Sequence, residues 1–192
     1  MKTSWYKKLS NQHYCLIGLG ILIATALILY AMGRVLICTC GYIDLWHPVI
    51  DSGNSQHIAD LYTFSHIIHG MAFFALLWLI ARKLPLGARA IIALLIEVSW
   101  EILENSPIII NRYRTATISL DYYGDSIINS IADILAMLVG FWLARKLPIW
   151  ATITLIIIME LGVAYFIRDN LTLNVIMLLY PFRAIRAWQI GG

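Results

Sequence analysis

Long runs of apolar residues, broken by short polar segments, form the main pattern of hydrophobic and polar positions along the chain. A helix needs about 20 mainly apolar residues to cross the hydrocarbon core of a bilayer. Five stretches approach that length, and we predict membrane spans near 14–34, 63–81, 88–108, 125–144 and 149–167. The third span contains glutamates and reaches Pro107, which we expect to end or kink its helix.

A sixth apolar stretch, 171–182, is too short to be read in the same way. As a helix it would rise only about 18 Å, which does not cross a bilayer comfortably. We predict a re-entrant or interfacial segment, or a short span extended through Arg183 and Arg186. The predicted fold class is therefore all-α: a polytopic membrane helical bundle with five transmembrane helices and a short C-terminal membrane segment. We treat residues 1–192 as a single integral-membrane domain.

Composition supports a membrane protein. Hydrophobic residues make up 60% of the chain and charged residues 13%, against roughly 25% charged residues in soluble proteins. This balance excludes a disordered tail and a small disulfide scaffold, and it argues against a water-soluble globule. It also excludes a nucleic-acid module, so we expect membrane lipids and no nucleic acid among the partners.

The basic residues predict the orientation. Eight of the 14 lie in three segments that contain no acid: Lys2, Lys7, Lys8, Arg82, Lys83, Arg89, Arg145 and Lys146. Lys and Arg are enriched in cytoplasmic loops, so we predict a cytoplasmic N-terminus and outward loops near 37–62 and 111–124. The first helix has no convincing cleavage site after it, and we interpret it as a retained anchor.

The ionisable residues inside the predicted spans are the functional candidates, because such residues are costly in a bilayer. They lie on coherent helix faces and, in the predicted topology, mostly in the outer half of the membrane. Arg112 and Arg114 lie in the loop directly above them. The set comprises His66 and His69, then Glu97, Glu101 and Glu104, then Asp125, Asn129 and Asp133, with Asp121 continuing the last stripe into the loop. We expect these faces to meet in one pocket.

Three explanations of this pocket stay open. Two imidazoles with carboxylates suit a divalent metal such as Zn, Mn or Fe, and buried carboxylates with histidine suit acid–base chemistry without metal. The third explanation is structural: the carboxylates pair with the histidines and arginines and specify helix packing. For single residues, Asp125 could instead cap a helix and an arginine could reach lipid headgroups. In the functional reading the metal ligands are His66, His69, Glu101 and Glu104, the catalytic residues are Glu97, Asp125, Asn129 and Asp133, and the substrate-binding residues are Arg112, Arg114 and Asp121.

The cysteines lie apart from this pocket. Cys38 and Cys40 are too close in sequence for an easy internal disulfide, so we expect a disulfide with a partner or a soft metal. We expect Cys15 to be a small buried hydrophobic residue, and His47 and His57, in the loop, to be solvated.

Several segments resemble an uncharacterised bacterial inner-membrane protein family, a domain of unknown function. They are NSQH at 54–57, TFSHIIHG at 63–70, WEILENSP at 100–107, RYR at 112–114, ATISLDYYGDS at 116–126 and RDNLTLN at 168–174. The resemblance covers about residues 40–189 and implies a multi-pass protein of the bacterial inner membrane. More loosely, the order His, Glu, Arg, Asp resembles the VanZ-like membrane proteins of glycopeptide resistance, which would imply an envelope role.

The functional hypothesis is a polar or metal pocket that acts on a lipid or lipid-linked envelope substrate by hydrolysis or transfer. One alternative is a transporter or proton-coupled carrier, in which Glu97, Asp133 and Glu160 form a relay. Another is an assembly factor for other membrane proteins. The sequence leaves open whether the protein is an enzyme, and it leaves open the oligomeric state.

Overall fold

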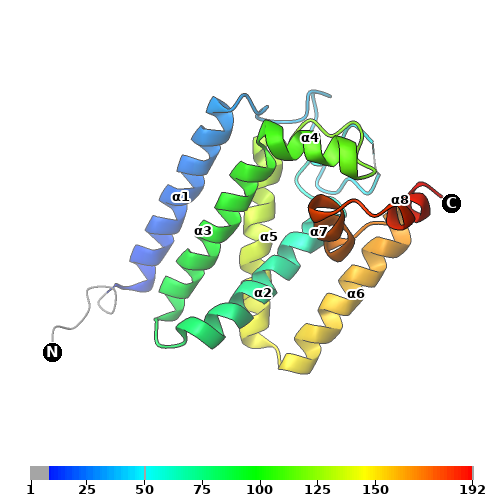
Figure 1. Cartoon of the computed structure of the whole chain (residues 1–192). Helices are drawn as coiled ribbons and strands as arrows, with labels where there is room; N and C mark the ends of the chain where they lie inside the picture. Colours follow the sequence, from blue (N-terminus) through cyan, green and yellow to red (C-terminus); the bar gives the residue numbers. More distant parts are fainter. Residues whose placement is uncertain (1–8, 50, 192) are drawn as a thin grey trace.

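The computed structural model describes residues 9–49 and 51–191, and within them the chain is all-helical (Figure 1). Lys2, Lys7 and Lys8, on which part of the predicted orientation rests, lie outside the described residues. In the described ranges there is no strand, only an isolated bridge between His47 and Asp60. The helices are α1 (Asn11–Ala31), α2 (Thr63–Ala81), α3 (Leu86–Glu104), α4 (Pro107–Ala116), α5 (Ile127–Lys146), α6 (Ile149–Ile167), α7 (Leu171–Leu179) and α8 (Arg183–Ile190).

Four of these helices, α1, α2, α5 and α6, are long and apolar enough to cross a membrane. The all-α class is thus confirmed, and α2 and α6 have the predicted bounds. The count of five spans is not confirmed: α3 has 19 residues, but Arg89 and three glutamates interrupt its apolar composition. Most apolar side chains of α1 and α6 are exposed, as expected for helices that face lipid.

The predicted span 88–108 is wrong at its C-terminal end. The helix stops at Glu104, and Pro107 begins the separate helix α4. The Ser106 hydroxyl accepts a hydrogen bond from the Ile109 amide, and proline at the first helical position has no amide hydrogen to leave unpaired. The predicted C-terminal segment is also two helices, because the chain is extended from Tyr180 to Phe182 between α7 and α8.

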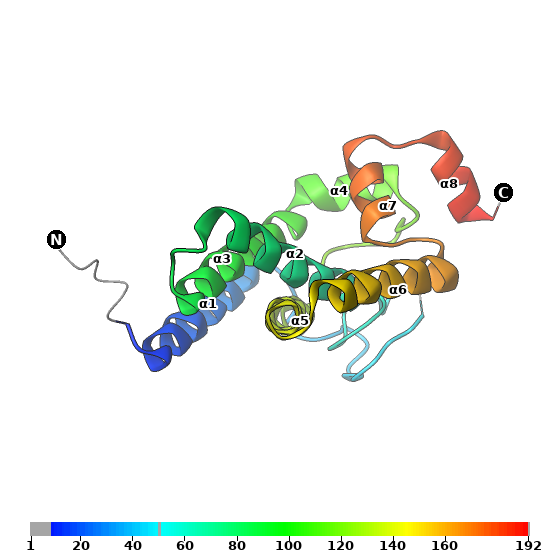
Figure 2. The same cartoon turned by 90° about the horizontal axis from the view of Figure 1, so that it is seen from below.

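The centre of the bundle is the pair α2 and α5, which pack more extensively on each other than any other two helices of the described chain. Glycine allows this close approach. A Cβ on Gly70 would lie 1.9 Å from the Met137 carbonyl oxygen, and one on Gly140 would lie 1.9 Å from the Ile67 carbonyl oxygen. Viewed from below, α1 and α3 lie on one side of this pair and α6 lies on the other (Figure 2).

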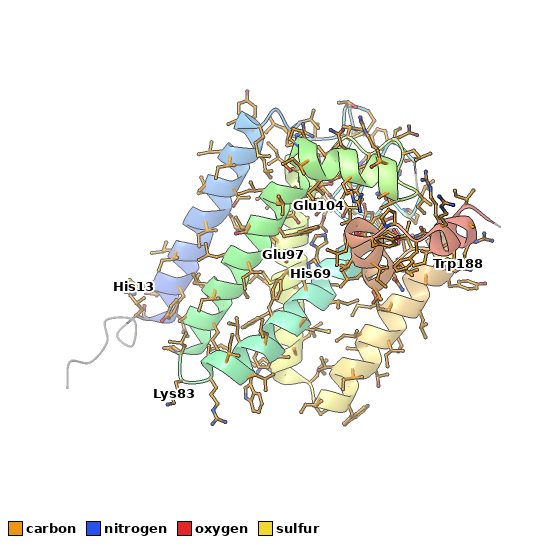
Figure 3. All side chains as sticks on the ribbon, viewed as in Figure 1. His13, His69, Lys83, Glu97, Glu104 and Trp188 are labelled. Carbon is orange, nitrogen blue, oxygen red and sulfur yellow. A yellow bond between two sulfur atoms is a disulfide. The ribbon has the colours of Figure 1, made fainter. Side chains whose placement is uncertain are left out.

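The two ends of the bundle differ in chemistry. The α2–α3 and α5–α6 connections, which carry the basic residues Arg82, Lys83, Arg145 and Lys146, turn at the same end (Figure 1). Lys83 lies at that end, whereas Glu104 lies at the other, beneath α4 (Figure 3). The N-terminus of α2 and the C-terminus of α3 therefore bring the candidate polar residues to the end opposite the basic turns.

Candidate functional site

The innermost part of the site is a carboxylate held by two histidines. Glu97 of α3 is fully buried, and its Oε1 lies 2.6 Å from Nδ1 of His66. Nδ1 of His69, one turn further along α2, lies 3.1 Å from both Glu97 oxygens. Because His66 and His69 are three residues apart on one helix, both rings face α3. The structure thus brings the predicted faces of α2 and α3 together at Glu97.

His66 is also the centre of a wider carboxylate group. Its Nδ1 lies 3.5 Å from Oε1 of Glu101, and its Nε2 lies 3.8 Å from Oδ2 of Asp133 on α5. The Thr63 hydroxyl donates to the other oxygen of Asp133 at 3.0 Å. One imidazole therefore faces carboxylates from both α3 and α5, so the site joins the two helices across α2.

Within the described part of the chain, the carboxylate of Glu101 has no hydrogen bond. The residue is only 1% exposed, and neither carboxylate oxygen has a hydrogen-bond partner. Leaving a buried polar atom without a partner costs about 1–3 kcal/mol, and more for a charged group. Such a group in a native structure needs an explanation, and a bound ion or water is one, so the oxygens of Glu101 are the site's strongest indication of a ligand.

The remaining carboxylates are hydrogen-bonded by neutral side chains. Asp125 accepts from the Asn105 amide at 2.7 Å and from the Tyr122 hydroxyl at 2.9 Å. Glu104 accepts from the Tyr113 hydroxyl at 2.7 Å. These donors orient the carboxylates but bring no positive charge, so they do not neutralise the group.

Burial also shifts the titration of the groups outside the spans. Desolvation raises the pKa of Asp125 to about 6, although the Tyr122 and Asn105 hydrogen bonds oppose the shift. Desolvation likewise raises the pKa of Tyr113 and of Tyr122 well above the usual range, and the nearby carboxylates add to it. Both phenols therefore remain neutral donors at physiological pH.

A cavity of about 130 Å³ lies beside this group, lined by His66, His69, Glu104, Asp125 and Asp133 but not by Glu97 or Glu101. That is room for a few water molecules or a small polar headgroup, but not for an acyl chain. Polar side chains from α2, α3, α5 and the loop before α5 line it, together with Trp100, Leu171 and Val175. Among the described residues, no Lys or Arg side chain lines this cavity. Five carboxylates (Glu97, Glu101, Glu104, Asp125 and Asp133) thus face two imidazoles, so the fully ionised group would carry a net charge of −3.

The predicted arginines lie outside the cavity. Arg112 donates to the backbone oxygens of Leu178 and Leu179 at the end of α7, at 2.8 and 3.3 Å. Arg114 donates to the Tyr122 carbonyl at 2.5 Å. Both arginines donate to backbone carbonyls and link α4 to the neighbouring segments. The expectation that they lie directly above the carboxylates is therefore not met.

Three other predicted residues also lie away from the cavity. Asn129 donates to the His57 carbonyl at 2.9 Å and belongs to the contact between α5 and the α1–α2 loop. Asp121 is exposed on the loop between α4 and α5. Glu160 accepts from the amides of Leu171 and Thr172 at the start of α7, at 3.0 and 3.1 Å. Glu160 therefore caps a helix and does not contact the residues of the predicted relay.

The aromatic and amide donors of the site were not predicted. Asn105, Tyr113 and Tyr122 bind its carboxylates, but Asn105 does not ionise and both tyrosines lie outside the predicted spans. Asn105 lies near the end of the third predicted span, and the two tyrosines lie in the loop between the third and fourth. Their position in the segments WEILENSP, RYR and ATISLDYYGDS was the available signal.

Two groups of side chains in this pocket have the donor atoms and proximity for a metal ion: His66, His69 and Glu97, and His66, Glu101 and Glu104. In each group the donor atoms lie within 4.8 Å of one another. The predicted ligand set of His66, His69, Glu101 and Glu104 is therefore divided, with His69 on the Glu97 side. Imidazole and carboxylate donors suit Zn, Mn or Fe.

The loop between α1 and α2 differs from its prediction. Cys38 and Cys40 are joined to each other by a disulfide, so the expectation of a partner disulfide is wrong. His57 is 1% exposed, so the expectation that it is solvated is wrong. The loop packs against the start of α5, where the Ser126 hydroxyl donates to the Gln56 carbonyl and the Asn129 amide donates to the His57 carbonyl. Cys15 is exposed on α1, so its predicted burial is also wrong.

Comparison with known proteins identifies the family. Residues 29–191 match the family model described as "Protein of unknown function (DUF2585)". The chain belongs to the DUF2585 family. Among its relatives are UPF0314 proteins of Sinorhizobium fredii, 56% identical over 174 residues (90% of this chain and 88% of the relative), and of Paracoccus denitrificans, 55% identical over 170 residues (88% of each). A UPF0314 protein of Brucella anthropi is 53% identical over 180 residues, or 91% of this chain and 92% of the relative.

The DUF2585 match confirms the resemblance to an uncharacterised bacterial family, and it includes every side chain of the pocket. The looser likeness to VanZ-like proteins is not shown by these comparisons. No solved structure matches the chain.

Proposed function

We propose that this DUF2585 protein is a bacterial inner-membrane protein that binds one divalent metal ion in the carboxylate–histidine pocket. With that ion it acts on a lipid or lipid-linked envelope substrate, by hydrolysis or group transfer. The observation that carries the proposal is Glu101, a buried carboxylate with two oxygens free of hydrogen bonds beside His66.

The charge of the pocket supports a cation. Five carboxylates beside two histidines, four of them buried and Glu104 half-buried, are unfavourable unless protons or a cation neutralise them. Protons alone would neutralise the charge but would leave Glu101 with one unpaired donor and unpaired acceptors. A metal ion both neutralises charge and accepts the lone pairs of the Glu101 and Glu104 oxygens, which the structure places together with a nitrogen of His66.

The shape of the pocket supports a headgroup as the ligand. The cavity is headgroup-sized, and apolar Leu171 and Val175 of α7 and the Trp100 ring form part of its wall. A lipid could place its polar group in the cavity while its chains stay beside the apolar helices. An anionic group such as a phosphate would be repelled by the carboxylates alone, so its binding depends on the bound cation. With the basic turns on the cytoplasmic side, the pocket opens to the outer leaflet.

The first experiment is a metal analysis of protein purified in detergent, with three variants side by side. Wild type is expected to hold about one equivalent of zinc, manganese or iron, and the His66→Ala/Glu101→Ala variant is expected to hold none. Glu160→Gln is the matched control, because the Glu160 carboxylate caps α7 and lies away from the pocket. This variant should bind as much metal as wild type. Absence of metal from wild type, even after reconstitution with each ion, would refute the metal site.

The second experiment tests the substrate class. Lipid extracts of cells that carry wild type or His66→Ala/Glu101→Ala are compared by mass spectrometry, with the Glu160→Gln strain as control. We expect a polar lipid or lipid-linked species to accumulate only in the double variant. Unchanged lipids together with a stoichiometric co-purifying membrane protein would favour the assembly-factor alternative, and altered proton flux in vesicles would favour the carrier.

A further inference from the structure

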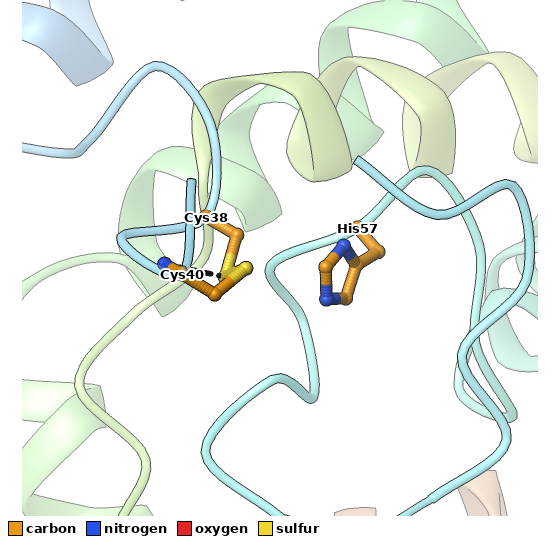
Figure 4. Close-up of side chains that lie close together, drawn as sticks. All are labelled: Cys38, Cys40 and His57. Carbon is orange, nitrogen blue, oxygen red and sulfur yellow. Dashed lines mark hydrogen bonds between the residues drawn. A yellow bond between two sulfur atoms is a disulfide. The ribbon is translucent and has the colours of Figure 1, made fainter. Parts of the chain in front are cut away.

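A second chemically distinct cluster lies in the loop between α1 and α2, outside the carboxylate pocket. It contains the Cys38–Cys40 disulfide and His57, one ring nitrogen of which lies within 4.8 Å of a sulfur atom of each cysteine (Figure 4). The proposed function uses none of these three residues. The question is what a disulfide at this place contributes to the protein.

Stabilisation of the fold is a weak explanation for this disulfide. The two cysteines are only two residues apart. A cross-link restrains the unfolded chain more as the loop that it closes becomes longer, and this loop is nearly the shortest one available. Cys38 and Cys40 thus fasten no distant parts of the chain to each other. A disulfide of this kind is better explained by its chemistry.

The two sulfurs differ in accessibility. Cys40 is exposed, whereas Cys38 is 4% exposed. An external thiolate can therefore reach Cys40 and not Cys38. The backbone N–H of Cys40 lies 3.1 Å from the Cys38 sulfur and donates to it. Because a thiolate is a much stronger acceptor than a disulfide sulfur, this contact favours Cys38 as the leaving group.

His57 offers a second donor to that leaving group. Its Nδ1 accepts the backbone N–H of Asp44 at 3.1 Å, so the proton of the neutral ring is on Nε2. This Nε2 is buried and has no hydrogen-bond partner. An unpaired buried donor beside a disulfide is unfavourable in the oxidised protein. Reduction creates a stronger acceptor, since a ring nitrogen of His57 lies within 4.8 Å of both sulfurs, and the reduced Cys40 thiol has the Tyr42 carbonyl 3.6 Å from its sulfur.

We propose that Cys38 and Cys40 form a redox-active pair that exchanges with an external dithiol, with Cys40 as the attacked sulfur and His57 as the residue that stabilises the reduced state. One thiolate of the dithiol attacks Cys40 Sγ and forms a mixed disulfide, and the electron pair of the broken bond stays on Cys38 Sγ. The second thiolate of the dithiol then closes the donor's own disulfide and releases Cys40. The donor loses two electrons and two protons, and Cys38 and Cys40 gain both.

The test uses full-length protein with Cys15→Ser, which removes the remaining free cysteine. The folded protein is equilibrated in buffers of reduced and oxidised dithiothreitol, and the thiols are counted by alkylation and mass spectrometry. We expect a reversible two-electron equilibrium without loss of helical structure. His57→Phe should shift that equilibrium toward the disulfide at least tenfold, or about 30 mV. His57→Gln, which keeps an N–H donor, should stay within about threefold of the parent.

Two single-cysteine proteins keep the proposal testable even where a His57 variant does not fold. With 5,5′-dithiobis(2-nitrobenzoate) as the probe, Cys40 in a Cys38→Ser protein should react at least tenfold faster than Cys38 in a Cys40→Ser protein. Equal reactivity would overturn the assignment. So would a disulfide that is reduced only when the protein unfolds, or a reduced pair that binds zinc and no longer exchanges with dithiothreitol.

Discussion

Replacing Glu101 with methionine should stabilise the metal-free protein, which is the reverse of the usual effect of a buried substitution. Methionine has a similar length and flexibility and carries no group that needs a hydrogen bond. The wild-type side chain is 1% exposed and leaves two oxygens unpaired. Each unsatisfied atom costs about 1–3 kcal/mol, so removing both oxygens should raise the free energy of unfolding by roughly 2–6 kcal/mol.

Part of this gain is offset by the lost attraction to His66, whose Nδ1 lies 3.5 Å away. That attraction is itself reduced, because His66 is closer to Glu97, at 2.6 Å, and because the remaining carboxylates repel Glu101. We therefore expect a net gain of about 2–3 kcal/mol, within the range seen when buried ionic groups are replaced by apolar ones. For a chain of this size the melting temperature should rise by about 4–12 °C.

The assay is thermal unfolding in detergent after treatment with a chelator, with Glu160→Met as the matched control. The Glu160 oxygens accept from the amides of Leu171 and Thr172, so the same substitution there should destabilise by about 1–3 kcal/mol. Opposite signs for the two variants are the signature of an unsatisfied carboxylate. If Glu101→Met lowers the melting temperature as Glu160→Met does, the reasoning about Glu101 is wrong.

Three further predictions concern other parts of the structure. Burial raises the pKa of Asp125 to about 6. The stability that this carboxyl group gives the metal-free protein is therefore complete below about pH 4 and falls by roughly 3 kcal/mol as the pH rises through 6. Asp125→Asn should flatten this part of a profile of unfolding free energy against pH. Gly70→Ala should destabilise the folded protein by about 3 kcal/mol or more, because the new Cβ would lie 1.9 Å from a backbone oxygen of α5. Gly20→Ala is the control: a Cβ there has no atom within 4 Å, so this variant should be neutral or slightly stabilising in the same melting assay. Arg112→Gln should increase proteolysis at the end of α7, where the arginine binds two carbonyls, and should leave metal content unchanged; lost metal would place Arg112 in the site after all.

The elements that the sequence predicts best are those with clear local signals. The bounds of α2 and α6 follow from apolar runs that begin and end beside polar or basic residues, and both are confirmed. The break after Glu104 depends on the Ser106–Pro107 pair, whose capping effect overrides the continued apolar run to Ile110. A window of hydropathy alone does not register such a cap.

The convergence of the carboxylates was also predictable, because helix periodicity and depth place His66, Glu97 and Glu101 on facing surfaces. The exact partners were not, because they depend on how far α2 and α3 are rotated against each other. Burial of His57 could not be predicted either. It results from hydrogen bonds between residues about 70 positions apart, such as that from Asn129 to the His57 carbonyl, which no local pattern encodes.

The most direct test of the central claim is X-ray absorption spectroscopy at the metal edge, on purified protein reconstituted with one equivalent of zinc. Ligation by the carboxylate–histidine pocket predicts a first shell of nitrogen and oxygen only, at about 2.0–2.2 Å, with the scattering pattern of at least one imidazole. The His66→Ala/Glu101→Ala variant should lose that spectrum. A shell containing sulfur at about 2.3 Å, or a spectrum unchanged in the double variant, would place the metal elsewhere and contradict the account.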